Sequence, residues 1–243
     1  MPRALVAAAG VLGVVAWVVL SPTDLGKRVA DSACVPKPTG LTHWWPGEGS
    51  AIDIVGGDHG TIAGSVDYAD GMVGRSFRFG RGYLRLSGAY GGLSAREISV
   101  VAWMQTQRSD GFQAIFSATT SSFVHLQTTS LGGSALYTDP IHTYEIPALT
   151  AEPTGIWRHV ALTAKTGDIR IYENAVATAR IAGAFSSITK PDGALLIGAG
   201  YELERPFQGL LDEIQVYDRA LADHEIQSLF RAGKAGICAA QPG

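Results

Sequence analysis

The chain has 243 residues and a formal net charge of −3; 17% of its residues are charged and 30 are glycine. This length suits one domain with a full hydrophobic core. The weakly acidic balance excludes electrostatic attraction to nucleic acid or to an anionic membrane surface as a basis for function. Abundant glycine with few charges is typical of many strands joined by tight turns.

The chain begins with an apolar segment. Residues Ala4–Leu20 include no charged or polar side chain, and Ser21 and Pro22 follow them. As a helix this run would cover about 25 Å, a little less than the ~30 Å hydrocarbon core of a bilayer. We expect residues 1–33 to be a signal peptide or membrane anchor plus a linker, with a buried helix as the alternative. The rest of the chain is therefore expected outside the cytoplasm, secreted or anchored, touching a membrane only through this segment.

The chain has two cysteines, Cys34 and Cys238, which bracket nearly all residues after the apolar segment. In an exported protein an even number of distant cysteines indicates a disulfide, and two buried free thiols are the alternative. The expected domain spans residues 34–238, and residues 239–243 form a tail.

From Gly40 onward apolar and polar residues alternate with the period of a strand. Segment 97–104 is apolar on both faces, so we expect it to be a central strand. The other expected strands are Phe77–Phe79, Leu84–Leu86, Phe123–Leu126, Trp157–Thr163, Ile169–Tyr172, Ala194–Ile197 and Leu210–Tyr217. Many short strands without helical crossovers predict an antiparallel sandwich or barrel. One helix is predicted over Asp223–Phe230, ending before Gly233.

An ordered set of motifs covers residues 34 to 238. It comprises Trp44-Trp45-Pro46-Gly47-Glu48-Gly49, Asp53–Gly57, Ile98–Trp103, Trp157–Thr163, Gly209–Ile214 and Tyr217–Leu221, between the two cysteines. The set resembles the laminin-G-like jelly-roll domain of the concanavalin-A-like lectin/glucanase superfamily, in its bacterial extracellular form. The resemblance implies an all-β fold, an antiparallel jelly-roll β-sandwich with one short C-terminal helix, here preceded by the N-terminal apolar helix. It also implies that the two ends of the sandwich lie side by side, so that Cys34 and Cys238 can bond.

Two positions depart from the family pattern. The turn after Tyr172 reads Asn174-Ala175 instead of ending in glycine, so we expect a turn of another type, because alanine is unfavourable at positive φ. The helix lacks the usual serine at position 222, and Asp223 is expected to cap it instead.

The sequence holds no recognisable catalytic motif. Glucanases of this superfamily carry alternating carboxylates on one strand, which direct acid and nucleophile into one cleft. No such segment occurs here, and Asp212 and Glu213 are adjacent, so on a regular strand they would face opposite sides. The histidines show no zinc spacing. We therefore expect that the protein is not an enzyme.

The tryptophans are expected mainly in the core. On a strand, Trp44 and Trp45 point to opposite faces and cannot form one sugar-stacking platform. Trp103 and Trp157 lie among apolar neighbours and are also expected to be core residues.

A structural calcium ion is implied by the resemblance. In many relatives an Asp of the first loop and the Asp of the Gly-x-x-Asp-Glu segment share calcium, which here are Asp53 and Asp212. Calcium takes six to eight oxygens, so carbonyls near Gly57 and His59 would complete the shell. The alternative is an Asx-turn at Asp53 and a surface carboxylate at Asp212.

The expected function is non-catalytic recognition of a glycan or an extracellular protein, by loops at one end of the sandwich or by its concave sheet. The candidate loops are 87–94, 106–113, 128–147 and 198–206, and the candidate stacking residues are Tyr90, Tyr137, Tyr144 and Tyr201. One alternative is a structural or adhesive module without a dedicated small ligand. Another is a polysaccharide-active hydrolase or lyase. No nucleic-acid partner is expected.

Overall fold

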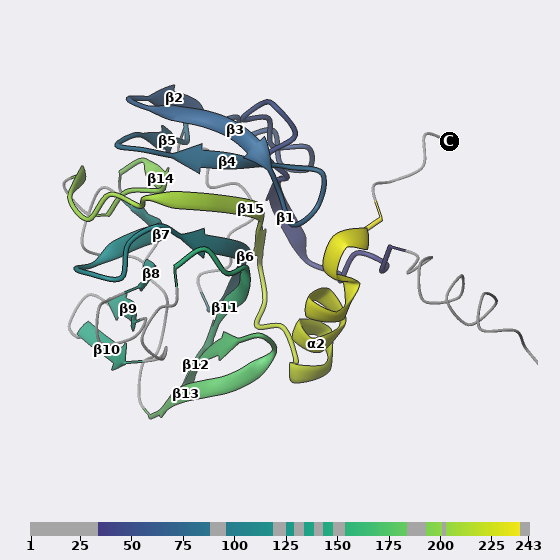
Figure 1. Ribbon diagram of the computed structural model, residues 1–243. Helices are drawn as coiled ribbons and strands as arrows, with labels where there is room; N and C mark the ends of the chain where they lie inside the picture. The colour runs from purple at the N-terminus through teal and green to yellow at the C-terminus, as the bar shows by residue number, and fades with distance from the viewer. Residues whose placement is uncertain are drawn as a thin grey trace, which may run out of the picture. The chain divides into compact units, whose positions relative to one another are not determined.

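The computed structural model describes residues 34–87, 96–118, 125–128, 134–138, 143–147, 154–183, 193–200 and 203–238. Their strands form two antiparallel sheets that pack face to face, and one short helix follows the last strand (Figure 1). The prediction of an all-β sandwich with one short C-terminal helix is therefore confirmed. The apolar segment at the start of the chain lies outside the described residues. Within the part that is described, no helix is both long and apolar enough to span a membrane.

The larger sheet carries the helix on its outer face. Its strands are β1 (Leu41–Trp45), β3 (Val66–Asp70), β4 (Arg75–Phe79), β6 (Glu97–Thr106), β11 (Arg158–Lys165), β12 (Asp168–Glu173), β13 (Val176–Ala182) and β15 (Gly209–Tyr217). They are ordered β13-β12-β11-β6-β15-β4-β3, and β1 pairs with the second half of β15.

The smaller sheet closes the other side of the core. Its strands are β2 (Thr61–Ala63), β5 (Tyr83–Arg85), β7 (Gln113–Ala118), β8 (His125–Thr128), β9 (Ser134–Thr138), β10 (Thr143–Pro147) and β14 (Leu195–Ile197). Their order is β10-β9-β8-β7-β14-β5-β2. Strands β9 and β10 lie inside the segment 128–147 that was predicted as a loop, so that prediction was wrong. Its polar and small residues hid the strand pattern.

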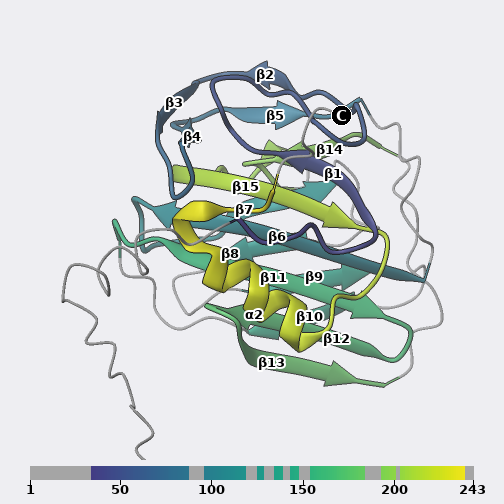
Figure 2. The same ribbon diagram turned by 90° about the vertical axis from the view of Figure 1, so that its right-hand side faces the viewer.

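Alternation along each central strand divides the apolar residues between two clusters. In β6, Val100 and Ala102 face the smaller sheet, while Val101 and Trp103 face outward. The outward residues pack against α2 (Asp223–Ala232), which lies across this face (Figure 2). Trp45 belongs to the inner cluster and Trp44 to the outer one, as their adjacent positions predict.

Trp103 and Trp157 were both predicted to be core residues, but only Trp103 is buried. Trp103 is 6% exposed and its ring contacts those of His159 and Phe230, with centroids 5.0 and 5.7 Å away. Trp157 lies just before β11 and is only half-buried, since it precedes the stretch that is covered on both faces.

The two ends of the domain meet beside the helix. Cys34 and Cys238 are disulfide-bonded with their Cα atoms 4.9 Å apart, and Val35 pairs with Ile237. The predicted disulfide is therefore confirmed. After α2 comes the short 3₁₀ helix η2 (Gly233–Ala235).

Both expected departures from the family pattern turned out differently. Asn174 and Ala175 have φ values of 48° and 65°, so the β12–β13 turn keeps the positive-φ geometry despite its alanine. The N-cap of α2 is Ala222, whose N–H donates to the Glu225 carboxylate at 2.9 Å. Asp223 does not cap the helix, because its carboxylate accepts hydrogen bonds from side chains of β12.

A β-bulge interrupts β15 where its neighbour changes from β4 to β1. Asp212 pairs with Trp103 of β6, the register then shifts, and Gln215 is the next paired residue. Glu213 has a φ of 51° and is the extra residue of the bulge. Consequently Ile214 enters the inner core, and Glu213 and Gln215 line the same small space beneath α2. The expected strict alternation of Asp212 and Glu213 does not occur.

Candidate functional site

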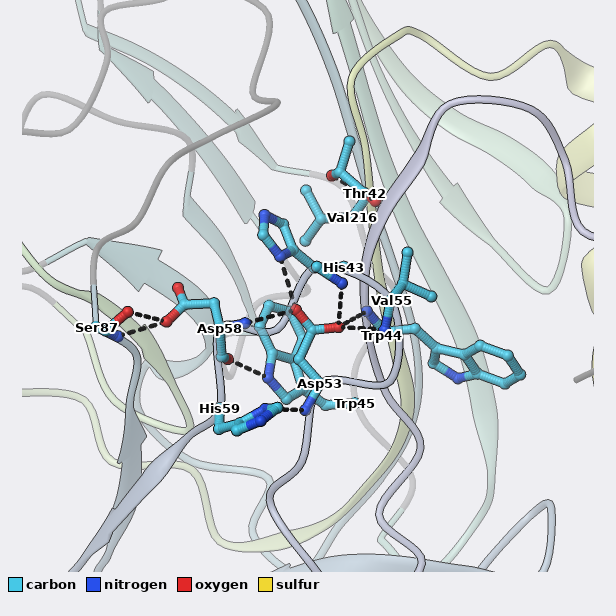
Figure 3. A network of polar contacts seen from close by, with 11 residues as sticks. Thr42, His43, Trp44, Trp45, Asp53, Val55, Asp58, His59, Ser87 and Val216 are labelled. Carbon is cyan, nitrogen blue, oxygen red and sulfur yellow. Dashed lines mark hydrogen bonds and ion pairs between the residues drawn. The ribbon is translucent and has the colours of Figure 1, made fainter. Parts of the chain in front are cut away.

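The loop after β1, here called the Asp53 loop (residues 51–58), folds back on the strand around one carboxylate. Asp53 is 2% exposed. Its two oxygens accept hydrogen bonds from His43 Nδ1 (2.8 Å) and from the backbone N–H groups of Trp44 (2.9 Å), Val55 (3.0 Å), Gly56 (3.0 Å) and Asp58 (3.1 Å), as Figure 3 shows. Because an ionised carboxylate only accepts, His43 must donate from Nδ1.

These donors keep Asp53 ionised. Burial alone would raise its pKa, but hydrogen bonds from His43 and from the backbone of Trp44, Val55 and Gly56 outweigh burial and lower the pKa to about 2. A carboxylate offers about four lone-pair directions, and the five N–H donors already point at its two oxygens. Asp53 therefore organises the loop, which agrees with the turn that was the alternative to a calcium ligand.

The rest of the sequence is adapted to this loop. A Cβ atom at Gly56 would lie 2.2 Å from His43 Nδ1, so only glycine fits there. The Asp58 carbonyl accepts from Trp45 Nε1 at 3.0 Å, and the Asp58 carboxylate accepts from the Ser87 N–H at 2.7 Å. The loop is thus bonded to β1 and to the segment after β5.

Asp212 belongs to a different cluster, here called the acidic corner (Glu48, Asp212 and Glu213). Asp212 is fully buried; its Oδ2 accepts from the Val73 N–H at 2.9 Å, while its Oδ1 has no hydrogen-bond partner within the described chain. Glu48 accepts from the Arg75 N–H at 3.1 and 3.2 Å. Burial raises the pKa of Asp212, and the charge of Glu48 adds a smaller effect in the same direction.

The path of the chain explains why Glu48, and not Asp53, lies near Asp212. Strand β1 ends at Trp45, which pairs with Ile214, and the next residues run on past the bulge. By Asp53 the chain has turned back to Trp44. Sequence reasoning missed Glu48, although it lies in the Trp-Trp-Pro-Gly-Glu-Gly motif.

The three candidate metal ligands therefore lie in two different places: His59 beside Asp53, and Asp212 in the acidic corner. His59 Nδ1 accepts from the Asp53 backbone N–H at 3.3 Å. Among the residues that the structure describes, no group of three His, Cys, Asp or Glu side chains is arranged to hold a metal ion. Calcium binding by Asp53 and Asp212 stays a prediction, and Oδ1 of Asp212 is an acceptor without a partner in the described chain.

Two carboxyls of the acidic corner, Asp212 and Glu213, keep their protons at pH values where exposed carboxyls are ionised. Burial raises the pKa of Asp212 to about 7. Burial, and then the charge of Asp212, raise the pKa of Glu213 to about 8. His159, which lines the same small space as Glu213, has its pKa lowered to about 3 by burial. The space beneath α2 is thus populated by neutral polar groups near neutral pH.

Because the pKa of Glu213 is raised in the fold, we expect the stability of the fold to fall as the pH rises. Glu213 keeps its proton in the fold up to a pKa of about 8, whereas the unfolded chain loses it above the ordinary value of 4.5. In a metal chelator we expect the free energy of unfolding to fall through this window, by roughly 1.4 kcal/mol for each pKa unit of difference. Urea unfolding at about pH 5 and about pH 9 measures the fall. Glu213→Gln should reduce it, and the exposed control Glu204→Gln should not.

Melting curves recorded in calcium and in a metal chelator test the predicted calcium site. An ion bound to Asp212 would favour the ionised carboxylate and raise the melting temperature as calcium increases. Identical melting curves in calcium and in chelator would leave Asp212 without a metal role.

For the pH experiment, an equal pH dependence in the parent and in Glu213→Gln would contradict the titration of Glu213.

The four candidate tyrosines fall in two classes. Tyr90 and Tyr201 lie outside the described residues. Tyr137 and Tyr144 lie on β9 and β10, where they are directly paired across the two strands. Their proposed role in stacking on a ligand is not tested by this geometry.

Two of the four candidate loops meet at one end of the sandwich, in a cluster here called the Phe112 platform (Phe112, Gln127 and Arg205). Phe112 is 48% exposed, and the Arg205 guanidinium carbon lies 4.7 Å from its ring centroid. Arg205 Nη1 also donates to Gln127 Oε1 at 3.0 Å, and the Arg205 carbonyl accepts from the Ala114 N–H at 2.9 Å. An exposed ring is thus held by a side chain that is itself fixed at both ends.

The backbone at this end is unusual. Leu203 and Arg205 have φ values of 63° and 56°, a region that costs free energy for residues with a side chain. A separate open depression of about 420 Å³ has a polar lining that includes Arg81, Gln107 and Gln208. Sequence reasoning had favoured tyrosines and missed Phe112, because the contact with Arg205 joins segments about ninety residues apart.

Comparison with known proteins identifies the architecture. The model of the family described as Concanavalin A-like lectin/glucanases superfamily matches residues 79–227. The chain has no match among curated proteins.

Solved structures share the fold at low sequence identity. Domain 4 of AbnA, a GH43 extracellular arabinanase from Geobacillus stearothermophilus, in complex with arabinotriose, is 23% identical; 77% of this chain and 96% of that chain align, with a TM-score of 0.65. The binding domain of Paraclostridial Mosquitocidal Protein 1 is 15% identical, over 79% of this chain and 52% of that one, with a TM-score of 0.66. The binding domain of Botulinum neurotoxin DC, in complex with rat synaptotagmin II, is 12% identical, over 79% and 51%, with a TM-score of 0.62.

Proposed function

Since the chain belongs to the concanavalin A-like lectin/glucanases superfamily, we propose that it is a non-catalytic module that binds a glycan or a protein partner outside the cytoplasm. The Phe112 platform is the proposed contact surface. The disulfide between Cys34 and Cys238 supports an oxidising, extracytoplasmic location.

The half-exposed ring of Phe112 under Arg205 is the observation that carries this proposal. Arg205 covers one side of the ring and leaves about half of the side chain exposed. A flat apolar ring beside the polar side chains of Arg205 and Gln127 suits a sugar face flanked by hydroxyls, or an interface anchor. Because the ring is fixed before binding, less conformational entropy is lost when a partner arrives.

The buried acids favour binding over catalysis. Glycoside hydrolysis needs two carboxyl groups that face each other across an open cleft. Asp212 and Glu213 are adjacent in the chain and 0% and 4% exposed, so a polysaccharide does not reach them.

The relatives of known structure give context for the partner. One of them was solved with arabinotriose and another with rat synaptotagmin II, a sugar and a protein respectively. Both kinds of partner are therefore candidates for this chain. A structural or adhesive module without a small ligand remains the alternative function.

Binding by the full chain to a glycan array tests the proposal, and the best ligand is then titrated against variants. Phe112→Ala and Arg205→Ala are each expected to weaken binding by about tenfold or more, because losing 1.4 kcal/mol is a tenfold change. Tyr137→Ala and Tyr144→Ala test the proposed tyrosines in the same series. Val176→Ala removes an apolar side chain that is even more exposed than Phe112, from edge strand β13, and should change nothing.

The outcomes separate the alternatives. Binding that survives both Phe112→Ala and Arg205→Ala would exclude the platform as the contact surface. If no glycan binds but an extracellular protein partner is lost in the same two variants, the platform is a protein-binding surface.

A further inference from the structure

A hollow of about 530 Å³ lies between the outer face of the larger sheet and the first turn of α2. Strands β11 and β12 form its floor, and the segment 220–222 and the helix form its wall. Figure 2 shows α2 lying across the face of the sheet that includes these two strands. At its rim Lys165 pairs with Glu97 at the start of β6, whereas Phe112 follows the other end of that strand. A ten-residue strand is about 30 Å long, so the hollow is remote from the Phe112 platform.

Ion pairs hold the lining of this hollow in place. Arg170 donates from Nε to Asp168 Oδ2 and from Nη1 to Asp223 Oδ1, both at 2.9 Å. The Tyr172 hydroxyl donates to the same Asp223 oxygen at 2.7 Å. These contacts join the helix to β12 and leave the second Asp223 oxygen and further N–H groups of Arg170 available. The lining is therefore preorganised without a ligand.

The charges of the residues that line the hollow cancel. Lys165 and Arg170 contribute two positive charges, Asp168 and Asp223 contribute two negative charges, and the sum is zero with His224 neutral. Outside the lining, Arg180 also forms an ion pair with Asp168. Lys165 is exposed, and its side chain makes no hydrogen bond or ion pair within the described part of the chain. Apart from Lys165, each lining charge is already paired, so a strongly charged ligand would find little uncompensated opposite charge here.

Hydrogen-bond donors and acceptors lie side by side in the same lining, as Arg170 does with Asp168 and Asp223. A hydroxyl group both donates and accepts, so neighbouring hydroxyls can bridge a guanidinium and a carboxylate that stand side by side. The buried side chain of Leu221 and the half-buried Ala220 add a small apolar surface. Concave sites that combine apolar surface with a few oriented polar groups are the usual form of small-ligand sites.

We propose that this hollow is a second ligand site, which takes a neutral saccharide unit. Lys165 and Arg170 donate to its oxygens, and the second oxygen of Asp223 accepts from its hydroxyls, while Asp168 holds Arg170 in place. The site does not depend on the function proposed for the Phe112 platform. With both sites occupied, one chain would hold a glycan at two positions and gain avidity.

The test is a titration of the ¹⁵N-labelled full chain, followed by amide shifts. The probes are methyl glucoside, methyl galactoside, methyl mannoside, cellobiose and maltose, with inorganic phosphate as the charged probe. We expect at least one sugar to produce saturable shifts confined to the β11–β12 turn and the first turn of α2. Lys165→Ala and Arg170→Gln should each weaken that binding by about tenfold.

The controls separate this site from the other one and from loss of fold. Lys234→Ala removes an exposed lysine of η2 and should bind as the parent does, and so should Phe112→Ala. Lys165→Ala removes no contact within the described chain, so its effect cannot be attributed to unfolding. No shift with any sugar, shifts with phosphate only, or equal affinity in Lys165→Ala and Arg170→Gln would overturn the proposal.

Discussion

Replacing both Cys34 and Cys238 with serine is expected to lower the free energy of unfolding by about 5 kcal/mol, as the chain-entropy model gives for so long a closed loop. The disulfide closes a loop with a sequence separation of 204 residues, so its loss frees nearly the whole domain in the unfolded state. The bond also holds the pairing of Val35 with Ile237. Urea unfolding of the parent and the double variant measures the difference.

The single variants provide the control for this effect. Cys34→Ser and Cys238→Ser each remove the same bond, so each should match the double variant. A loss below about 1 kcal/mol would mean that the unfolded chain gains little freedom when the bond is absent.

Replacing Asp53 with alanine is expected to destabilise the fold by roughly 3–5 kcal/mol, because buried N–H donors lose their acceptor. Asp53 accepts from His43 and from four backbone N–H groups, and it is 2% exposed. Asp53→Asn keeps one acceptor oxygen and should have an intermediate effect. The exposed acid Asp67, paired with Arg78 on the surface, is the matched control, and Asp67→Ala should change the free energy of unfolding far less than Asp53→Ala does.

We also expect Asp53 to contribute to a loss of stability in acid. Its pKa in the fold, about 2, lies below the ordinary 3.8, so the unfolded chain takes up the proton first. The contribution of Asp53 is fully present above about pH 4 and is lost as the pH falls through about 2. Asp53→Asn should lack this part of the acid transition. If Asp53→Ala unfolds at the same urea concentration as the parent, the carboxylate does not hold the loop.

Periodicity predicted the parts of the fold that depend on local pattern. Alternation placed Trp44 and Trp45 on opposite faces, and an unbroken apolar run identified β6 as a central strand. Family motifs predicted the disulfide and the jelly roll. These signals suffice because burial on one or both faces of a strand leaves a direct mark on its sequence.

The site could be predicted only in part, because its contacts are long-range. The bulge at Glu213 arises where β4 gives way to β1 beside β15, which no local pattern encodes. The same geometry brings Glu48, and not Asp53, toward Asp212. Phe112 becomes a candidate only when Arg205 is seen above its ring. Ala175 keeps its positive φ because tertiary contacts override its intrinsic preference.

The most direct test of non-catalytic binding is to recover a glycan after it has bound. The full chain is incubated with the array ligand that binds best, and the released ligand is analysed by chromatography and mass spectrometry. We predict that the glycan returns intact from the parent protein and that Phe112→Ala retains much less of it. A shortened or unsaturated glycan, formed by the parent and by Phe112→Ala alike, would contradict the account and show a hydrolase or lyase instead.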